Sequence, residues 1–140
     1  MNMSRYVKKT KKNKKLTTLI TVESVDDFFR RGKKIAKLLD QKKAITPRRI
    51  ISFEDVVEFT NFLTKNKLKL VSTIRRHPES ISRLAVILRR SRAAIDKDVK
   101  ALEAVGIVKR ETIINPGHGR KRIIKITDDN PICIQMQAIL

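Results

Sequence analysis

The chain has 140 residues, with 33 lysines and arginines against 14 aspartates and glutamates, so its formal net charge at pH 7 is +19. A protein this basic needs a polyanion or an acidic surface as its partner. No run of about 18 apolar residues appears and no apolar signal-peptide core begins the chain, so we expect a cytoplasmic protein without a membrane span. The single cysteine, Cys133, fits a reducing compartment.

Residues 1–15 form a block of like charge, with seven basic side chains and no acidic one. Because like charges repel and little apolar surface is available, we expect a flexible basic arm. The alternative is a tail that only raises solubility. The candidate phosphate contacts of the arm are Lys8, Lys9, Lys11, Lys12, Lys14 and Lys15.

Residues 16–52 predict a strand–helix–strand unit. The β-branched segment 16–22 predicts a strand, and Ser24 offers an N-cap for a helix over 25–40. A second short strand is expected around 48–52. The unit is too small for an independent core, so it should pack on the remaining chain or on another subunit, and we expect it to contribute to dimerisation. The apolar stripe of the helix is Val25, Phe28, Phe29, Ile35, Leu38 and Leu39.

The pattern from Ser52 to Pro78 predicts two helices. Ser52 can cap the first, with Asp55 at the spacing of a capping box. A break near residues 64–66 should divide this helix from the second, which ends before Pro78.

Two shorter helices are expected around a tight basic turn, Arg89-Arg90-Ser91. Ser80 can cap the first helix and Ser91 the second. Gly106 fits the C′ position that ends a helix. The buried stripe of the second helix is expected at i, i+4 and i+7, which are Ile95, Val99 and Leu102.

Residues 107–127 predict a β-hairpin. Segments 107–114 and 122–127 are β-like, and the turn cluster from Asn115 to Gly119 holds two of the four glycines. The tip of this hairpin, or wing, is basic. Residues 53–127 as a whole carry seventeen basic and eight acidic side chains, so their excess of +9 is the second main site of positive charge.

The segment SISRLAVILRRSRAAIDKDVKALEAVGIVKRE resembles MarR-type regulators, in which a recognition helix ends in D-V-x-x-L-x-x-x-G-L-V-x-R. Here that ending runs from Asp98 to Arg110. The resemblance covers residues 53–127 and is specific for the winged helix-turn-helix class. The N-terminal unit resembles the extension of small archaeal and bacterial predicted regulators, some of which look like antitoxins. The implied fold is α+β, mainly α: a winged helix-turn-helix with a small N-terminal strand-helix-strand extension.

The resemblance implies that the recognition helix, residues 92–105, lies in the major groove of DNA and the wing, residues 115–122, at the minor groove. The predicted DNA-binding residues are Arg89, Arg90, Ser91, Arg92, Ala93, Asp96, Lys97, Lys100, His118, Arg120, Lys121 and Arg122.

Side-chain chemistry assigns different tasks within this set. Arg92 can donate twice to a guanine edge, and small Ala93 allows close approach to a thymine methyl. Lys97 and Lys100 suit phosphates. In the family the position of Lys97 is often arginine, so the bidentate geometry is lost here. Asp96 is expected either to accept from a cytosine amine or to hold Arg92 four residues away. The alternative for this face is a solvated helix surface with internal ion pairs.

In the wing, Arg120 is the candidate for insertion into the minor groove, with Lys121 or Arg122 on phosphate and His118 as a phosphate donor or a bystander. The alternative is a disordered hairpin tip. A winged helix can also act as a protein–protein module.

No catalytic or metal site is visible in the sequence, so we predict neither an enzyme nor a cofactor. His77, His118 and Cys133 lack the spacing of metal ligands, and no phosphate-binding glycine loop occurs. Cys133 lies between apolar neighbours and is expected to pack as a small hydrophobic residue, with oxidant sensing as the alternative.

Residues 128–140 end in an apolar segment that permits a helix or a strand and needs a partner surface. Together with the N-terminal unit it predicts a homodimer that matches palindromic half-sites. The predicted function is a sequence-specific, double-stranded DNA-binding transcriptional repressor associated with the nucleoid. The alternatives are an antitoxin with a toxin partner and a non-specific architectural chromatin protein. The few aromatic residues count against single-stranded RNA as the ligand.

Overall fold

The computed structural model describes residues 17–44 and 48–136, and it divides into two compact units. The sheet unit contains the described residues up to Thr60 together with those from Asn130 onward, and the helical unit spans Asn61–Asp129. The predicted basic arm, residues 1–15, lies outside the described residues. Helices predominate over strands, and the predicted class, α+β and mainly α, is confirmed.

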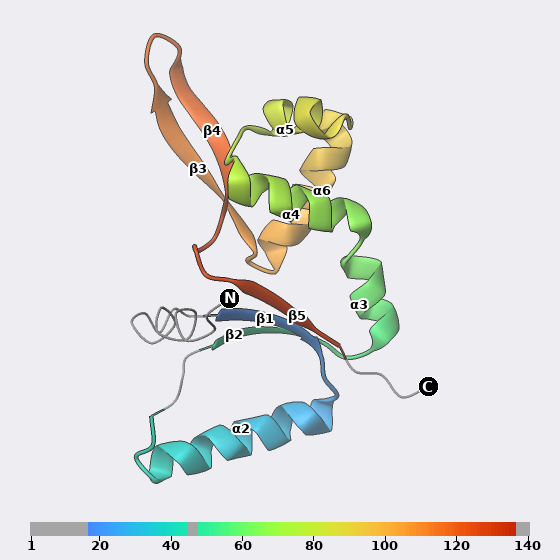
Figure 1. The fold of residues 1–140 in the computed structure, drawn as a ribbon, viewed down its shortest axis with the longest axis vertical. Coiled ribbons are helices and arrows are strands. Elements are labelled where there is room, and N and C mark those ends of the chain that lie inside the picture. The colour runs from blue at the N-terminus through green and yellow to red at the C-terminus, as the bar shows by residue number, and fades with distance from the viewer. Residues whose placement is uncertain (1–16, 45–47, 137–140) are drawn as a thin grey trace, which may run out of the picture. The chain divides into compact units, whose positions relative to one another are not determined.

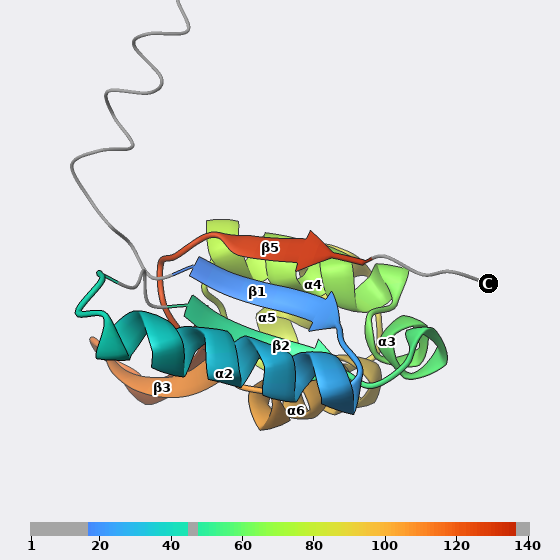
Figure 2. The same ribbon diagram turned by 90° about the horizontal axis from the view of Figure 1, so that it is seen from below.

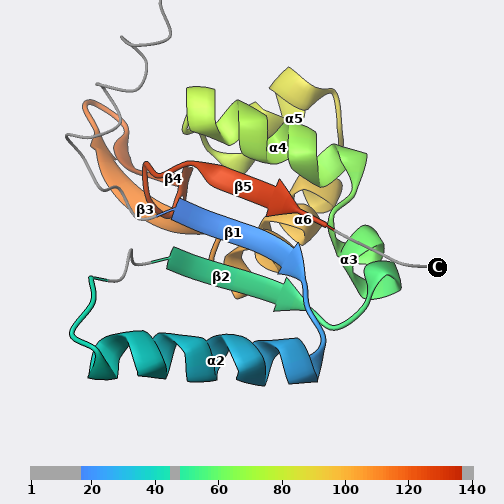
Figure 3. The same ribbon diagram turned by 60° about the horizontal axis from the view of Figure 1, so that its bottom comes forward.

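The sheet unit is built on three parallel strands. β1 (Thr17–Val22) lies in the centre, flanked by β2 (Arg48–Phe53) and β5 (Ile132–Gln135). Parallel neighbours need a crossover, which α2 (Val25–Asp40) provides by running back beside the sheet against the direction of the strands (Figures 2 and 3). The side chain of Ser24 accepts a hydrogen bond from the Asp27 backbone N–H, which confirms the predicted N-cap.

The C-terminal segment is a strand, so of the two alternatives the helix is wrong for its described part. β5 pairs with β1, with Cys133 in register with Leu19. The pairing with β1 supplies backbone partners that a segment of four residues could not provide for itself. Because β5 is an edge strand, Cys133 is exposed, and the expectation that its thiol is packed away is wrong.

The predicted helix start at Ser52 is also wrong. β2 continues to Phe53, whose carbonyl accepts from the Glu23 N–H at 2.8 Å. Asp55 is the residue that caps α3 (Val56–Phe62), because its Oδ1 accepts from the Glu58 N–H at 2.8 Å. Cross-strand pairing with β1 therefore prevails over the capping-box spacing at Ser52.

The helical unit consists of three helices followed by a two-stranded hairpin (Figure 1). α4 spans Lys65–Arg76, α5 spans Ile81–Leu88 and α6 spans Arg92–Ala104. β3 (Val108–Asn115) and β4 (Gly119–Ile126) form the antiparallel hairpin. The predicted caps Ser80 and Ser91 are confirmed, and Thr64 caps α4. Side chains exposed by 1% or less fill the core of this unit: Leu70, Ile74, Leu84, Ile95, Val99, Leu102 and Ile124.

The end of α6 fixes where the hairpin begins. Gly106 has a φ of +78°, and the Gly106 and Ile107 N–H groups donate to Glu103 and Leu102 carbonyls at 2.9 Å. This is a Schellman C-cap, as the sequence predicts at Gly106. The Thr127 hydroxyl donates to the Gly106 carbonyl at 2.7 Å, so the same turn holds the residue that follows the hairpin.

We expect Gly106→Ala to destabilise the helical unit by about 1–2 kcal/mol, because an alanine Cβ is strained at positive φ. Gly106→Asn should cost less, since asparagine tolerates the left-handed region. Urea unfolding of the two variants beside the wild type measures the difference. Equal losses for alanine and asparagine would show that the positive φ is not the source of the strain.

Candidate nucleic-acid interface

A tight turn joins α5 to α6 and sets the direction of α6. Arg89 occupies the left-handed region with φ of 53°, and the Arg89 and Arg90 N–H groups donate to the Val86 and Ala85 carbonyls. Ser91 then begins α6, its hydroxyl accepting from the Ala94 N–H at 3.1 Å. Ser91 is thus placed as the helix cap, and the side chain of Arg89 is exposed at the turn.

One side of α6 is buried and the other is open. Ile95, Val99 and Leu102 are 0% exposed, which confirms the predicted stripe. The opposite side presents its first residues and its lysines to solvent. The exposed residues of the helix are Arg92, Ala93, Lys97, Lys100, Glu103 and Ala104, and Asp96 is half-buried beside them.

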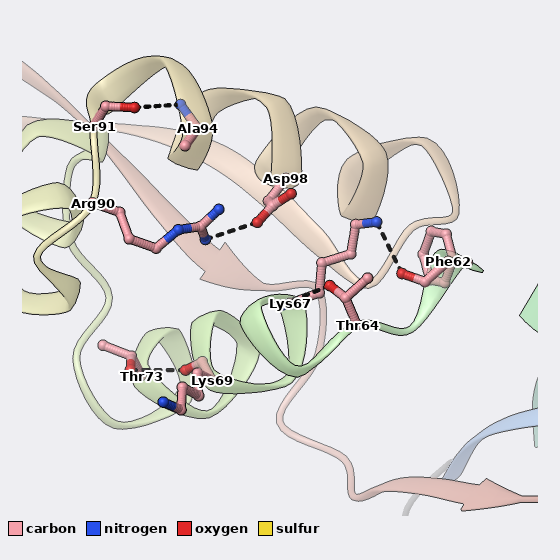
Figure 4. Close-up of polar contacts among 9 residues, drawn as sticks. All are labelled: Phe62, Thr64, Lys67, Lys69, Thr73, Arg90, Ser91, Ala94 and Asp98. Carbon is pink, nitrogen blue, oxygen red and sulfur yellow. Dashed lines mark hydrogen bonds and ion pairs between the residues drawn. The ribbon is translucent and has the colours of Figure 1, made fainter. Parts of the chain in front are cut away.

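Arg90 points back into the protein. Its Nη1 lies 2.8 Å from Oδ2 of Asp98, and the two side chains are only 22% and 15% exposed (Figure 4). The pair ties the turn to the middle of α6. Sequence analysis placed Arg90 among the DNA contacts, and the structure gives its guanidinium a bracing role within the chain.

Asp96 is the centre of a small ion-pair cluster. Its carboxylate lies 2.9 Å from the Lys100 amine and 3.3 Å from the Arg110 guanidinium, and Arg110 also contacts Glu103 at 3.1 Å. Hydrogen bonds from Lys100 and then from Arg110 lower the pKa of Asp96. The interpretation in which Asp96 holds Arg92 is therefore wrong, because the carboxylate is engaged by these two other cations.

Arg110 ends the motif that resembles MarR-type regulators, but sequence reasoning assigned it no contact. It lies on β3, half-buried, and joins the base of the hairpin to α6 through two carboxylates. Its contacts with Glu103 and Asp96, seven and fourteen residues away, reveal its role. Its place as the last residue of the motif was its sequence signal.

The hairpin ends in a tight turn with a basic flank. The His118 N–H donates to the Asn115 carbonyl at 2.9 Å, and Gly117 between them has φ of +81°, as a Pro-Gly type II turn requires. The tip extends beyond the helices of this unit (Figure 1). Three predicted wing residues are exposed near it: His118, Arg120 and Arg122.

Lys121 differs from its neighbours on β4. Its amine lies 3.3 Å from Glu79, and the Ile124 N–H donates to the Glu79 carbonyl at 2.8 Å. These contacts attach β4 to the residues just before α5. Strand alternation places Arg120 and Arg122 on the opposite side from Lys121.

A polar hollow of about 530 Å³ lies between the start of α4 and the side of α6. Sequence analysis did not identify the residues that α4 and its approach contribute, although Thr64 as an N-cap was a usable signal. Lys67 is held there, its amine donating to the Phe62 carbonyl at 2.9 Å (Figure 4). The lining residues are Asn61, Thr64, Asn66, Lys67, Arg90, Ala94, Lys97 and Asp98.

Over the part of the chain that the structure describes, no three histidine, cysteine or acidic residues gather as a metal site would need. In the same residues no helix combines the length and the apolar character required to cross a membrane.

A short helix, a tight turn, a second helix with an exposed face and a two-stranded hairpin define a winged helix-turn-helix, and residues 61–129 have this fold. Residues 62–130 match the family model described as HVO_A0114. None of the curated proteins matches the sequence.

Three solved structures are similar to parts of the chain. A possible transcriptional regulator from Methanosarcina mazei Go1 is 26% identical with a TM-score of 0.40, and the match covers 52% of this chain and 63% of that one. A transcriptional regulator homologue from Pyrococcus horikoshii OT3 is 20% identical over 51% of this chain and 72% of that chain, with a TM-score of 0.42.

The third structure is a homodimeric winged helix-turn-helix DNA-binding domain from Mycobacterium bovis, titled a possible ArsR-family regulator. It is 15% identical over 69% of this chain and 72% of that chain, with a TM-score of 0.41. Because all three TM-scores lie below 0.5, the fold assignment rests on the elements of the chain itself. The finer resemblance to MarR-type regulators and antitoxins stays a prediction.

The lowered pKa of Asp96 predicts a pH dependence of stability. A carboxyl group whose pKa is lowered in the folded state stabilises the fold at any pH above its ordinary pKa. This contribution is lost as the pH falls through the lowered pKa, below about pH 4. We expect Asp96→Asn to lower the Tm slightly at neutral pH and the difference from wild type to vanish in acid.

Asp129→Asn, which makes the same charge change at an exposed position, is the control. Thermal unfolding from pH 2.5 to 7 measures both variants. A difference for Asp96→Asn that persists unchanged at the acidic end would contradict the assignment.

Proposed function

We propose that the chain is a sequence-specific regulator of transcription that binds double-stranded DNA and represses by occupying an operator. The observation that carries the proposal is the two-sided α6: a fully buried apolar stripe and an exposed cationic face beginning at the N-terminal end. Winged helices use such a face in the major groove, N-terminal residues first. No chemical step is needed, because an occupied operator excludes polymerase.

The exposed residues of α6 divide into base and backbone contacts. Arg92 is the first residue of the helix and its fork can donate to O6 and N7 of guanine. Ala93 beside it leaves room for close approach. Lys97 lies at the polar hollow next to the start of α4, where a phosphate oxygen would meet the lysine and the positive end of the α4 dipole.

The wing supplies the second contact. Arg120 and Arg122 are exposed on one side of β4, with His118 at the tip. An arginine side chain in a narrow minor groove is favoured by the enhanced negative potential there. The lysines of residues 1–15 would add sequence-independent affinity through phosphates. We further propose a homodimer, since two-fold symmetry matches half-sites about one helical turn apart.

A second candidate is a non-specific architectural protein, and one observation favours it. Asp96 was the acidic residue that argued for base selection, and its carboxylate is engaged by Lys100 and Arg110. Fewer groups then remain to read bases. Genomic selection of bound DNA at two salt concentrations separates the two: an enriched palindrome indicates a regulator, and uniform binding with a steep salt slope indicates an architectural protein. The antitoxin alternative rests on the resemblance alone.

We expect Arg92→Ala to lower affinity for the selected site by about 1–3 kcal/mol and to relax the preference at one base pair. Lys97→Ala should weaken all sequences alike and reduce the salt slope by about one. Fluorescence anisotropy with selected and scrambled duplexes at two or more salt concentrations measures both effects.

Lys43→Ala in the sheet unit removes the same charge from an exposed position outside the proposed interface and is the control. Unchanged binding by both α6 variants would mean that α6 is not the recognition helix. If Lys43→Ala lowered DNA affinity as much as the α6 variants do, the change in net charge alone would explain the loss.

A further inference from the structure

Much of the apolar surface of α2 is exposed. All sixteen residues of α2 are described and none of them is buried. Ile35 and Leu38 are half-buried, whereas Phe29 and Leu39 are each 60% exposed and Val25 is 53% exposed. An exposed apolar stripe of this length on one helix indicates a surface that meets another apolar surface.

Phe28 is also 50% exposed and packs edge-on against Phe29, and five of the other exposed residues have the spacing of a helix–helix seam. The stripe consists of Val25, Phe29, Gly32, Ala36 and Leu39, separated by four, three, four and three residues. At about 100° per residue it lies roughly a quarter turn around α2 from Ile35 and Leu38. It therefore points to a different side of the helix from these two half-buried residues.

The seam of one copy is complementary in shape to the seam of a second copy that runs in the opposite direction. When two copies run antiparallel with Gly32 at the centre, Val25 of one lies opposite Leu39 of the other. Phe29 likewise lies opposite Ala36, so that the largest side chain of the seam meets the single methyl group of an alanine. Such alternation of large and small residues is what close packing across a two-fold axis needs.

Gly32 itself supports a close approach. It is a mid-helix residue without a positive φ, and a Cβ added there would meet nothing within 4 Å. Neither backbone conformation nor crowding within the chain accounts for the glycine, although glycine weakens a helix relative to alanine. A second helix crossing at this point would account for it, because the absent side chain lets two backbones come together.

The charges beside the seam suit the antiparallel direction. Asp26 and Asp27 are exposed at the beginning of α2, and Lys37 is exposed in its last turn. In the antiparallel pair Asp26 of one copy lies on the same side of the seam as Lys37 of the other, whereas Asp27 is ion-paired with Arg30 of its own helix. The long side chains of Arg30, Lys33 and Lys34 border the solvent side and can extend into water.

We propose that α2 is the dimerisation element of this protein and that two copies of the chain pack their α2 helices antiparallel across a two-fold axis at Gly32. The inference specifies the homodimer of the proposed function, but its argument uses only the sheet unit. The proposed dimer interface and the proposed DNA binding can therefore be refuted independently of each other.

A cysteine cross-link tests the geometry directly. In a Cys133→Ser background, which removes the only native cysteine, Gly32→Cys places two thiols across the axis, within the span a disulfide bridges. We expect most of this variant to become a covalent dimer under mild oxidation at low micromolar concentration. Lys34→Cys, on the opposite side of α2, is the control and should stay largely monomeric on a non-reducing gel. Equal cross-linking at both positions, or none at residue 32, would overturn the proposal.

A second pair of variants tests the seam in solution. Phe29→Glu replaces an exposed ring, so folding should be kept, and the dimer dissociation constant should rise about tenfold or more. Gln41→Glu makes the same charge change away from the seam and should leave the dimer intact. Sedimentation at several concentrations gives the constants, and wild-type protein that is monomeric throughout, or a dimer insensitive to Phe29→Glu, would refute the interface. Anisotropy with duplex DNA on the same samples shows separately whether the chain binds DNA.

Discussion

The rotation of α6 about its own axis is the constraint on which the rest of the helical unit depends. Ile95, Val99 and Leu102 are fully buried against the core side chains of α4 and α5. A rotation by one residue position would carry Asp96 and Lys100 into that core, where charged groups are costly. The apolar stripe thus fixes which residues face solvent, and the Schellman turn at Gly106 then fixes where the hairpin starts. The cationic face of α6 and the wing are consequences of the same packing.

The basic residues of the helical unit have two different roles. Arg90 and Arg110 fasten α6 to the turn before it and to the strand after it, and Lys121 fastens β4 to the residues before α5. Arg92, Lys97 and Arg120 project from the surface that these contacts hold in place. Net charge alone does not distinguish the two kinds, because each residue adds one positive charge to the total. A basic residue braces the fold when a carboxylate lies within reach of it, and the fold determines where that carboxylate lies.

Local patterns were readable from the sequence, and contacts between distant elements were not. The caps at Ser24, Ser80 and Ser91 and the stripe of α6 follow from spacing within a few residues, and the structure confirms them. The strand pairing of β5 with β1 joins the two ends of the chain, so no local pattern could choose it over a helix. The same holds for Asp96 with Arg110. At Ser52 the local capping signal was present, but long-range pairing of β2 with β1 prevailed.

The sheet unit raises the question of how copies of a chain with net charge +19 could associate at all. Repulsion between two such chains opposes association, and it is strongest where the excess is concentrated. The helical unit holds seventeen basic and seven acidic side chains, whereas the stripe from Val25 to Leu39 on α2 carries no charge. Residues 17–60, in which the seam lies, hold nine basic and seven acidic side chains, so the association energy is kept separate from the basic arm and from the cationic faces of the helical unit. If duplex DNA is the partner, its phosphates would neutralise the remaining repulsion, so that DNA binding and dimer formation would favour each other by linkage.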